Sequence, residues 1–322
     1  MAKCCVGIDL GGTYIKSGVL DENLRPGRML EFPTPIRDGK DAVVAALIAA
    51  ARAAMNAAGV SAADVVGVGI GSPGPISISK GLIIALPNIP GMKNVPLRNL
   101  VSEALHLPAV LENDANAAAL GEYLCGAGGR KGDMVLLTLG TGVGSGIIVE
   151  GKVLHGSHEI GAELGHMVVH PGGEQCNCGQ QGCLERYSSA TYLAEYAVRL
   201  LASTGRPSSL RDLKAKKKAV DSKAILEAAQ AGDELAREVW ERAMYYLAVG
   251  CVSICRIFDP ERILLGGGMV RAGDALLEPV REKFRKLHWH LTPILTEIHL
   301  ASLGSDAGVI GAAGAAWAAM KH

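Results

Sequence analysis

The chain has 322 residues, 49% of them hydrophobic, and its 32 basic side chains balance 32 acidic ones. This length is sufficient for two domains with buried cores. A formal net charge of zero argues against a broad basic surface, so we expect no nucleic-acid or membrane partner. The N-terminus lacks the apolar stretch of a signal peptide, and the low-charge segment 307–320 is too short to span a bilayer. We therefore expect a cytoplasmic protein.

Residues 3–20 predict two strands joined by a glycine turn, with Asp9 ending the first strand. Residues 134–154 repeat this pattern around a glycine-rich turn at 140–146. The repetition predicts a duplicated α/β domain with a cleft between its halves. Glycine lets backbone amides approach phosphate oxygens closely, but such turns are common without a ligand. It is the pair of turns that indicates a phosphate site.

Two common glycine-rich nucleotide-binding motifs, the P-loop and the dinucleotide-binding motif, are excluded by the sequence. The chain contains no P-loop motif. Residues 69–74 match Gly-x-Gly-x-x-Gly after a strand, but Pro75 and the β-rich residues that follow do not open a helix. We therefore expect no dinucleotide site there.

The next elements are predicted from apolar periodicity and turn residues. A helix is expected over 41–58, a strand over 64–70, a strand over 108–112 and a helix over 115–125. Asn113 and Asp114 stand between the last two. Read alone, Asp114 is most simply a helix cap, and a helix N-terminus favours its ionised form.

Three cysteines fall within eight residues, Cys176, Cys178 and Cys183, and His166 precedes the first by ten positions. One imidazole and three thiolates match the ligand count of a tetrahedral structural zinc site. A disulfide explains the pattern less well, because Cys176 and Cys178 are too close to pair comfortably and one thiol would be left over. The spacing therefore predicts zinc.

Two glutamates, Glu163 and Glu185, lie on either side of this cysteine-rich loop in the sequence. Zinc takes one nitrogen of His166 and leaves the other as an oriented polar group. If the loop folds back, both carboxylates and this imidazole converge on a spot suited to a polyol, because each carboxylate accepts several hydroxyl protons. The alternative is that both glutamates are simply solvated.

The remainder of the chain predicts mostly helices. They are expected over 187–203, 224–231, 234–258, 275–287 and 305–320, with strands over 262–266 and 298–301. The polar segment 203–221 contains four lysines between 214 and 218, which we interpret as a solvated face rather than a nucleic-acid patch.

The segment from Glu163 through His166 to the cysteine loop and Glu185 resembles the signature of the ROK family (repressor, ORF, kinase) of sugar kinases. The resemblance covers almost the whole chain. It implies an actin-like ATPase (ribonuclease H-like) fold in two domains, a small one at 1–118 completed by a C-terminal helix at 305–322 and a large one at 119–304. The family often carries an aspartate soon after the turn that corresponds to residues 71–75, and this chain has Ser77 there instead.

The resemblance also implies roles for individual residues. Asp114 is the expected general base, and Asp9 orients Mg²⁺ through a bound water. The expected sugar ligands are Gly74, Asn88, Asn113, Asp114, Glu163, His166 and Glu185. The expected nucleotide ligands are Asp9, Gly11, Gly12, Thr13, Lys16, Thr141, Gly142, Gly144, Gly267 and Gly268, and the zinc ligands are His166, Cys176, Cys178 and Cys183.

We therefore expect a glucokinase-like hexose kinase that uses ATP, Mg²⁺ and structural zinc, and that forms a homodimer or homotetramer. The residues leave open other hexoses (N-acetylmannosamine, N-acetylglucosamine, mannose, allose or fructose) and other donors such as polyphosphate. A sugar-sensing regulator of the same family is a different class. Only eight residues precede Asp9, so we expect no DNA-binding helix-turn-helix before it.

Overall fold

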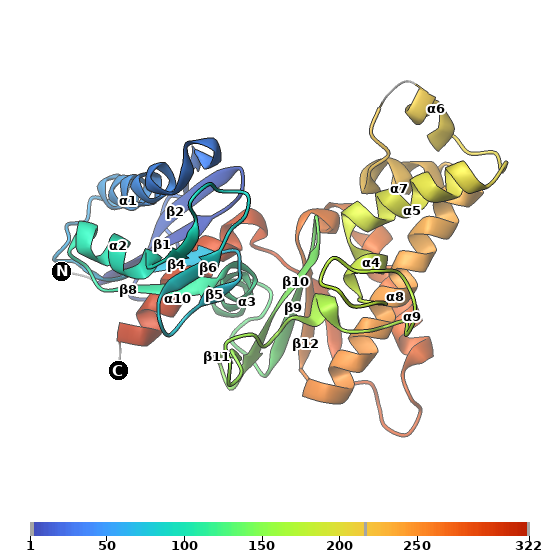
Figure 1. Ribbon diagram of the computed structural model, residues 1–322. Coiled ribbons are helices and arrows are strands. Elements are labelled where there is room, and N and C mark those ends of the chain that lie inside the picture. The colour runs from blue at the N-terminus through green and yellow to red at the C-terminus, as the bar shows by residue number, and fades with distance from the viewer. Residues whose placement is uncertain (1–2, 216–217, 321–322) are drawn as a thin grey trace. The chain divides into compact units, whose positions relative to one another are not determined.

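The computed structural model describes residues 3–215 and 218–320, and the chain divides into two compact units (Figure 1). Unit 1 combines the residues up to Lys131 with 146–162 and the residues from Ser302 onward. Unit 2 combines 132–145 with 163–301. The boundary expected at 118 falls inside a helix that continues to Cys125, so the compact unit extends beyond it. The functional domain limits, 1–118 with 305–322 and 119–304, stay a prediction.

Unit 1 is built on a mixed sheet with the strand order β3-β2-β1-β4-β8. Strand β1 pairs antiparallel with β2 and parallel with β4, which pairs parallel with β8. The five strands are β1 (Cys4–Leu10), β2 (Tyr14–Asp21), β3 (Leu30–Pro33), β4 (Val65–Ser72) and β8 (Ala109–Asn113). Strands β1 and β4 are apolar almost throughout because helices cover the sheet, and such strands lack the alternation of half-exposed ones.

The helices of unit 1 pack against this sheet. Helix α1 (Gly39–Ala58) follows the short 3-10 turn η1 (Ile36–Asp38) and packs on β1 and β2. Helix α10 (Ala307–Met320) follows η4 (Gly304–Asp306) and contacts β1 and β4. Helix α2 (Leu97–Leu105) contacts α1 and β8, and helix α3 (Asp114–Cys125) packs on α10.

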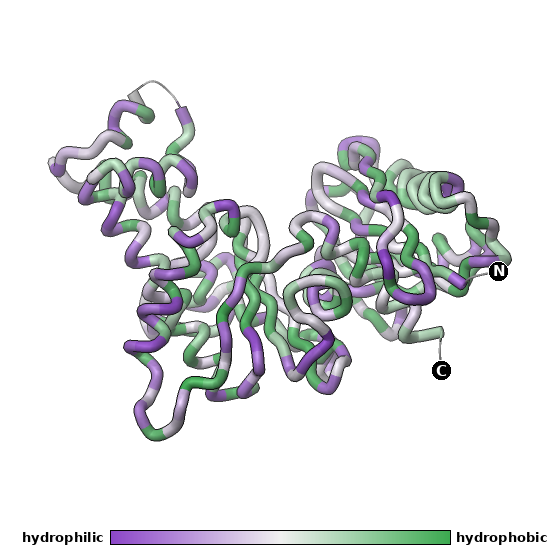
Figure 2. The backbone as a smooth tube through the Cα atoms, turned by 180° about the vertical axis from the view of Figure 1, so that it is seen from behind, coloured by the Kyte–Doolittle hydropathy of each residue, from purple (hydrophilic) through white to green (hydrophobic). Residues whose placement is uncertain are grey.

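Helix α1 is apolar along most of its length (Figure 2). Among the described residues, one helical segment, Ile36–Ala58, is long and apolar enough to cross a bilayer by length and composition alone, a test that a soluble core helix also passes. Val43, Leu47 and Ala51 of this helix are completely buried against the core of unit 1. The packing accounts for the composition without a membrane.

Helices α3 and α10 approach each other so closely that two positions require glycine. A Cβ atom at Gly311 would lie 1.6 Å from the carbonyl oxygen of Ala117, and one at Gly121 would lie 2.1 Å from that of Ala307. Backbone atoms cannot move aside as a side chain does, so any larger residue at either position forces the helices apart. This contact fixes α3, and with it Asp114, against α10.

Unit 2 contains most of a second sheet, with the order β11-β10-β9-β12-β13. This order repeats that of the first sheet, strand for strand in chain order. The strands are β9 (Met134–Leu139), β10 (Val143–Val149), β11 (Lys152–Val153), β12 (Arg262–Gly266) and β13 (Glu297–Leu300). The chain passes from unit 2 to unit 1 within β10, at residues 145–146. The duplicated pair of hairpins expected from the sequence is present.

The helices of unit 2 pack around the long α8 (Glu234–Phe258), which contacts α4, α5, α7 and α9. The others are η2 (Leu164–His166), α4 (Glu185–Ser188), α5 (Ala190–Ser203), α6 (Leu210–Ala215), α7 (Ser222–Gln230), η3 (Gly268–Ala272) and α9 (Asp274–Leu287). The helix predicted over 187–203 is interrupted: Ser189 is extended, and its hydroxyl caps α5 by accepting a hydrogen bond from the Tyr192 amide.

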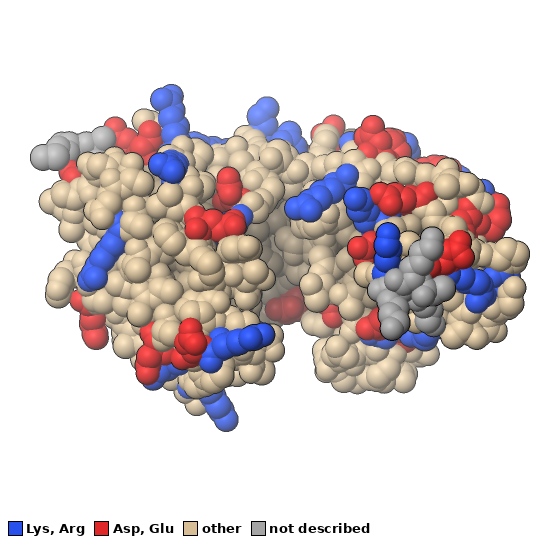
Figure 3. All heavy atoms as spheres, turned by 90° about the horizontal axis from the view of Figure 1, so that it is seen from above, with Lys and Arg blue, Asp and Glu red and all other residues tan. Residues whose placement is uncertain are grey.

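Two further features differ from, or lie beyond, the sequence-based expectations. A small antiparallel sheet of β5 (Ile76–Ser77), β6 (Leu82–Ala85) and β7 (Lys93–Val95) begins at the β-rich residues after Pro75, where no sheet was predicted. Of the basic segment 214–218, Lys216 and Lys217 lie outside the described residues. Among the described side chains on the face shown in Figure 3, basic and acidic groups are interspersed and neither sign gathers into one continuous patch.

Candidate active site and metal centre

Asn113 and Asp114 stand where strand β8 passes directly into helix α3. The helix cap is Asn113, because its Oδ1 accepts hydrogen bonds from the amides of Ala115 at 2.9 Å and Asn116 at 3.2 Å. Asp114 is the first helical residue, and its Oδ1 accepts from the Ala115 amide at 2.8 Å. The expectation that Asp114 caps the helix is therefore wrong. The extended backbone of Asn113 is the conformation that a cap requires.

Asp114 lies in an environment that favours its protonated form. Burial raises the pKa of the Asp114 carboxyl above its ordinary value, and hydrogen bonds from backbone amides and from Asn113 only partly oppose this. The amides at the helix N-terminus favour the ionised form, as expected, but desolvation outweighs them. A carboxylate with a raised pKa accepts a proton more readily near neutral pH.

Asp9, near the end of β1, is a second carboxylate in the same unit. Burial, together with the negative charge of Asp114, raises the pKa of Asp9 to about 7. Lys16 is the cross-strand partner of Asp9 in the β1–β2 register, and its charge opposes the shift. Two mutually repelling acids in one place form a natural site for positive charge.

Glycines surround the Asp9 carboxylate. A Cβ atom at Gly308, near the start of α10, would lie 2.7 Å from Asp9 Oδ2, and one at Gly71 of β4 would lie 3.5 Å from Asp9 Oδ1. Gly308 therefore leaves room for the carboxylate of Asp9.

The other predicted ligands in unit 1 lie in exposed turns. Gly11, Gly12 and Thr13 form the β1–β2 turn, which Thr34 supports by donating its hydroxyl proton to the Gly11 carbonyl at 2.8 Å. Asn88 is exposed in the turn between β6 and β7. A Cβ atom at Gly74 would lie 3.7 Å from Asn113 Nδ2, so the structure brings Gly74 to Asn113.

In unit 2, the β9–β10 turn contains Thr141 and Gly142 and is held by the residue that follows the cysteine loop. Glu185 Oε2 accepts a hydrogen bond from the Val143 amide at 2.9 Å, and a Cβ atom at Gly142 would lie 2.3 Å from that oxygen. The Ala190 amide donates to the Gly140 carbonyl at 2.9 Å. Glu185 is therefore not merely solvated.

The segment Glu163–His166 packs on the same strand. A Cβ atom at Gly165 would lie 1.9 Å from the Val143 carbonyl oxygen, so only glycine fits at this position. On either side of it in the sequence, Glu163 is exposed and His166 is partly buried. The Leu164 amide donates to Ser145 Oγ at 2.9 Å. Val143 thus contacts the Glu-x-Gly-His segment through its carbonyl and Glu185 through its amide.

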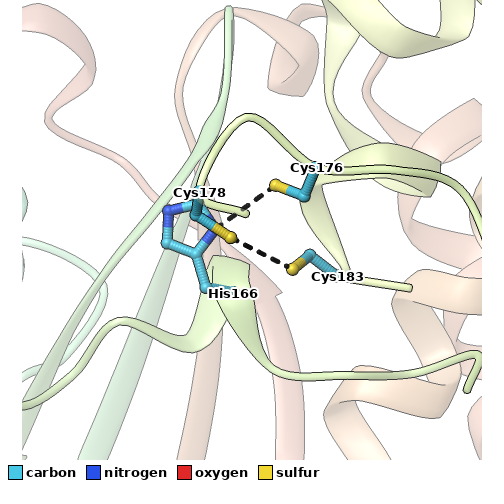
Figure 4. A group of neighbouring side chains, drawn as sticks. All are labelled: His166, Cys176, Cys178 and Cys183. Atoms are coloured by element: carbon cyan, nitrogen blue, oxygen red, sulfur yellow. Dashed lines mark hydrogen bonds between the residues drawn. The ribbon is translucent and has the colours of Figure 1, made fainter. Parts of the chain in front are cut away.

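The four predicted metal ligands converge (Figure 4). Their ligating atoms all lie within 4.8 Å of one another. Cys178 Sγ is 3.6 Å from Cys183 Sγ, and Cys176 Sγ is 3.7 Å from His166 Nδ1. Ligands about 2.3 Å from a tetrahedral zinc lie about 3.8 Å apart, so the cluster has the dimensions of such a site. Nδ1 faces the sulfur atoms, which leaves Nε2 for another partner.

The glycine turn after β12 lies beside the start of the β9–β10 turn. Gly266 pairs with Thr138 in the parallel β12–β9 register. Gly267 has a φ of 81°, and a Cβ atom there would lie within 2.6 Å of the Leu139 backbone. The predicted nucleotide residues of unit 2, Thr141, Gly142, Gly144, Gly267 and Gly268, therefore follow neighbouring strands.

Three residues that were not among the predicted ligands contact this region of unit 1. Glu112 is buried and accepts a 2.7 Å hydrogen bond from His155, while Glu159 accepts one from Ser77 at 2.9 Å. The partners are separated by 43 and 82 positions. The position of Glu112 directly before Asn113 could have indicated that Glu112 lies near the site, but nothing in the sequence indicated its pairing with His155.

A protein-family model described as the ROK family matches residues 5–319. The chain belongs to the ROK family. A glucokinase of Halalkalibacterium halodurans is 38% identical over 95% of this chain and 92% of that protein. The crystal structure of a ROK hexokinase from Thermus thermophilus is 36% identical, covers 99% of both chains and superposes with a TM-score of 0.83.

A ROK glucokinase from Streptomyces griseus, solved in complex with glucose and AMPPNP, is 34% identical, covers 98% of this chain and 99% of that one, and has a TM-score of 0.79. These likenesses confirm that this ROK protein has the two-domain actin-like ATPase fold, with the two repeated sheets as its halves.

Proposed function

We propose that this protein is a hexose kinase that transfers the γ-phosphoryl group of ATP to the 6-hydroxyl of glucose. The observation that carries the proposal is the likeness to glucokinases along 95% of the chain. The site chemistry is consistent with it, because phosphoryl transfer to an alcohol needs a positioned base and a place for concentrated positive charge.

Asp114 takes the proton of the 6-hydroxyl in this proposal. The hydroxyl oxygen forms a bond to the γ-phosphorus while the bond from that phosphorus to the β,γ-bridging oxygen breaks, and ADP leaves with the bridging oxygen. The proton passes to Asp114. Because the transition state is loose, positioning the hydroxyl matters more than early deprotonation. The raised pKa of Asp114 suits a group that gains a proton late in the step.

The sugar ligands proposed in unit 1 are Gly74, Asn88, Asn113 and Asp114. Asn113 uses Oδ1 to cap α3, so its Nδ2 group remains to donate a hydrogen bond to a ring hydroxyl. In unit 2 the proposed ligands are Glu163, the Nε2 atom of His166, and Glu185. The Oε2 atom of Glu185 binds Val143, which orients Oε1 as the acceptor for a sugar hydroxyl.

Zinc is proposed to hold the cysteine loop through Cys176, Cys178, Cys183 and His166 Nδ1. The donor set and the spacing of the ligating atoms fit a structural site, and a full shell of four protein ligands leaves no position for an activated water. The backbone amide of Gln180 lowers the pKa of the Cys178 thiol to about 7, which favours the thiolate form that binds metal. The consequence is a fixed ring orientation for His166.

The nucleotide phosphates are proposed to contact the two glycine turns, at Gly11, Gly12, Thr13, Thr141, Gly142 and Gly144, with Gly267 and Gly268 beside the adenosine. Mg²⁺ bound with ATP supplies positive charge to the phosphates, and Asp9 fits it as a partly buried carboxylate beside Asp114. Lys16 forms an ion pair with Glu31 at 3.2 Å and keeps a second cationic group near Asp9.

The proposal is tested by measuring ADP release with ATP over glucose, mannose, fructose, allose, N-acetylmannosamine and N-acetylglucosamine. Glucose should give the highest kcat/KM. ADP release with another hexose but not with glucose would show that the other hexose is the substrate. Binding of a hexose without ADP release would favour a sugar-sensing regulator instead. Polyphosphate in place of ATP tests the donor. We also propose that the protein forms a homodimer or homotetramer. We place it in the cytoplasm, where reducing conditions keep the cysteine ligands as thiols or thiolates.

A further inference from the structure

Glu112 is a buried carboxylate at the junction between β8 and α3, with a side chain 5% exposed. Its Oε1 accepts hydrogen bonds from the Asn113 amide at 2.9 Å and from Asn116 Nδ2 at 3.0 Å. Its Oε2 lies 2.7 Å from His155 Nε2. A buried carboxylate is strongly unfavourable unless it is hydrogen-bonded and paired, so His155 is a structural requirement of this junction.

His155 begins the segment 155–161, which we call the latch loop. The loop closes on itself, because the Gly161 amide donates to the His155 carbonyl at 3.0 Å. Near its other end, Glu159 accepts hydrogen bonds from the Ser77 hydroxyl at 2.9 Å and from the Ser79 amide at 2.7 Å. The latch loop is thus attached to the β8–α3 junction by His155 and to the β5 turn by Glu159.

Both attachment points adjoin residues proposed to bind the sugar. Glu112 precedes Asn113 and binds its amide, while Ser77 follows the turn that contains Gly74. Gly74 lies beside Asn113, because a Cβ atom added at Gly74 would lie 3.7 Å from the Asn113 Nδ2 atom. The latch loop therefore connects the two segments of unit 1 that carry Gly74, Asn113 and Asp114.

We propose that Glu112 and His155 form a positioning pair that fixes the latch loop as a wall beside Asn113 and Gly74, and thereby sets the affinity for the hexose. The proposal rests on the hexose kinase function proposed above. Neither residue touches the reacting atoms in this account. They act through Asn113 and through the loop, so their loss should change sugar affinity more than the rate of phosphoryl transfer.

The pair also predicts a pH dependence. The hydrogen bond to Glu112 raises the pKa of His155, and the charges of Glu112 and Glu159 add to this effect, while burial opposes it. The imidazolium is therefore retained above the ordinary histidine value of about 6.5. As the pH rises through the raised pKa, His155 loses its charge and the ion pair with Glu112 is lost. The KM for glucose should then increase on the alkaline side.

The test compares His155→Ala and His155→Gln with His158→Ala as a matched control. His158 is exposed in the same loop. A charge-assisted hydrogen bond of this kind corresponds to roughly a tenfold change in an equilibrium constant. We expect His155→Ala to raise the KM for glucose about tenfold, with kcat and the KM for ATP within about twofold of wild type. His155→Gln should bind glucose at an intermediate level and abolish the alkaline rise in KM, and His158→Ala should behave as wild type.

Thermal melting and glucose titration calorimetry accompany the kinetics, so that a folding defect is separated from a positioning defect. If His155→Ala and His155→Gln both melt like wild type and keep its KM for glucose and its pH profile, the positioning pair is refuted while the kinase function stands. If wild type neither binds nor phosphorylates any hexose, the proposed function fails and the inference fails with it. A fall in kcat at unchanged KM would also overturn the inference.

Discussion

Units 1 and 2 carry sheets with the same strand order, yet they position their candidate site residues by different means. In unit 1, Asn113 and Asp114 lie at the junction of a strand and a helix, and the helix is held by backbone contact with α10. In unit 2, Glu163 and His166 lie on an irregular segment beside the cysteine cluster. One unit relies on close packing and the other on a set of metal-type ligands.

The difference predicts where each unit is sensitive. Close packing between α3 and α10 tolerates no added atom, but it needs no bound partner. The cysteine loop has little regular secondary structure of its own, so its order depends on what holds the four ligating side chains together. Glu185 and Gly165 both meet Val143, so a disturbance of the loop in unit 2 reaches the β9–β10 turn. The β1–β2 turn is supported by Thr34 instead.

The largest effect is expected from Cys178→Ser, which removes one of the four proposed zinc ligands. Structural zinc contributes on the order of 10 kcal/mol of apparent binding free energy in small sites, so the variant should lose both its zinc and its glucose binding. Metal analysis and calorimetry measure these. Cys125→Ser is the matched control, since Cys125 lies in unit 1, where its thiol donates to the Leu24 carbonyl. Normal glucose binding by Cys178→Ser would break the link from the metal to His166.

Asp114→Asn tests the base of unit 1. The amide cannot accept the proton, so kcat should fall at least about a hundredfold, which corresponds to about 2.7 kcal/mol, while the dissociation constant for glucose changes little. Steady-state kinetics and calorimetry on one preparation separate the two quantities. A loss of tenfold or less would count against Asp114 as the base.

Gly311→Ala tests the packing of unit 1. The added methyl group would overlap the Ala117 carbonyl, so the free energy of unfolding should fall by about 2 kcal/mol, within the range for overpacking, and the zinc content should stay unchanged. Denaturant unfolding measures the change. Gly205→Ala serves as the control, because a Cβ atom there meets no atom within 4 Å. Equal stability of the two variants would contradict the packing argument.

A fourth prediction concerns the charge of Asp9. Its pKa of about 7 in the folded state lies above the ordinary 3.8, so the folded protein retains a proton that the unfolded chain has lost between these values. The free energy of unfolding should therefore decrease as the pH rises from about 4 to 7, and Asp9→Asn should be more stable than wild type at pH 8. Denaturant unfolding in magnesium-free buffer measures this.

Asp64 provides the opposite sign for comparison. Hydrogen bonds from the Ser61 hydroxyl and amide lower the pKa of Asp64, so its contribution to stability is present above the ordinary aspartate pKa and is lost on acidification. Asp64→Asn should therefore destabilise the protein at neutral pH. If Asp9→Asn also destabilises the protein, burial and the repulsion by Asp114 do not dominate the contribution of Asp9 to stability.

The regular elements could largely be predicted from the sequence. Helix α8 begins and ends where its apolar periodicity predicts, and both hairpins were evident from their strands and glycine turns. The convergence of His166 with the three cysteines was also predictable, because a tetrahedral site restricts ligand spacing strongly. These are features whose physical cause is local or is carried by a few characteristic residues.

Other features depend on three-dimensional context. Asn113 rather than Asp114 caps α3, and only the backbone conformation decides between two adjacent residues that both cap well. The raised pKa of Asp114 results from burial, which no local pattern measures. The pairing of Glu112 with His155 joins the end of β8 to the segment after β11, 43 positions further along the chain. The site residues were therefore easier to list than their protonation was to predict.

Helix α10 has a consequence for how the protein is made. It contacts β1 and β4, yet the ribosome synthesises it after all of unit 2. The face of the first sheet that α10 covers therefore stays exposed while residues 132–301 are synthesised. During that time the residues of unit 2 can fold around their cysteine cluster. During translation the older half of the polypeptide is the one that needs chaperone protection, until the last helix arrives to close it.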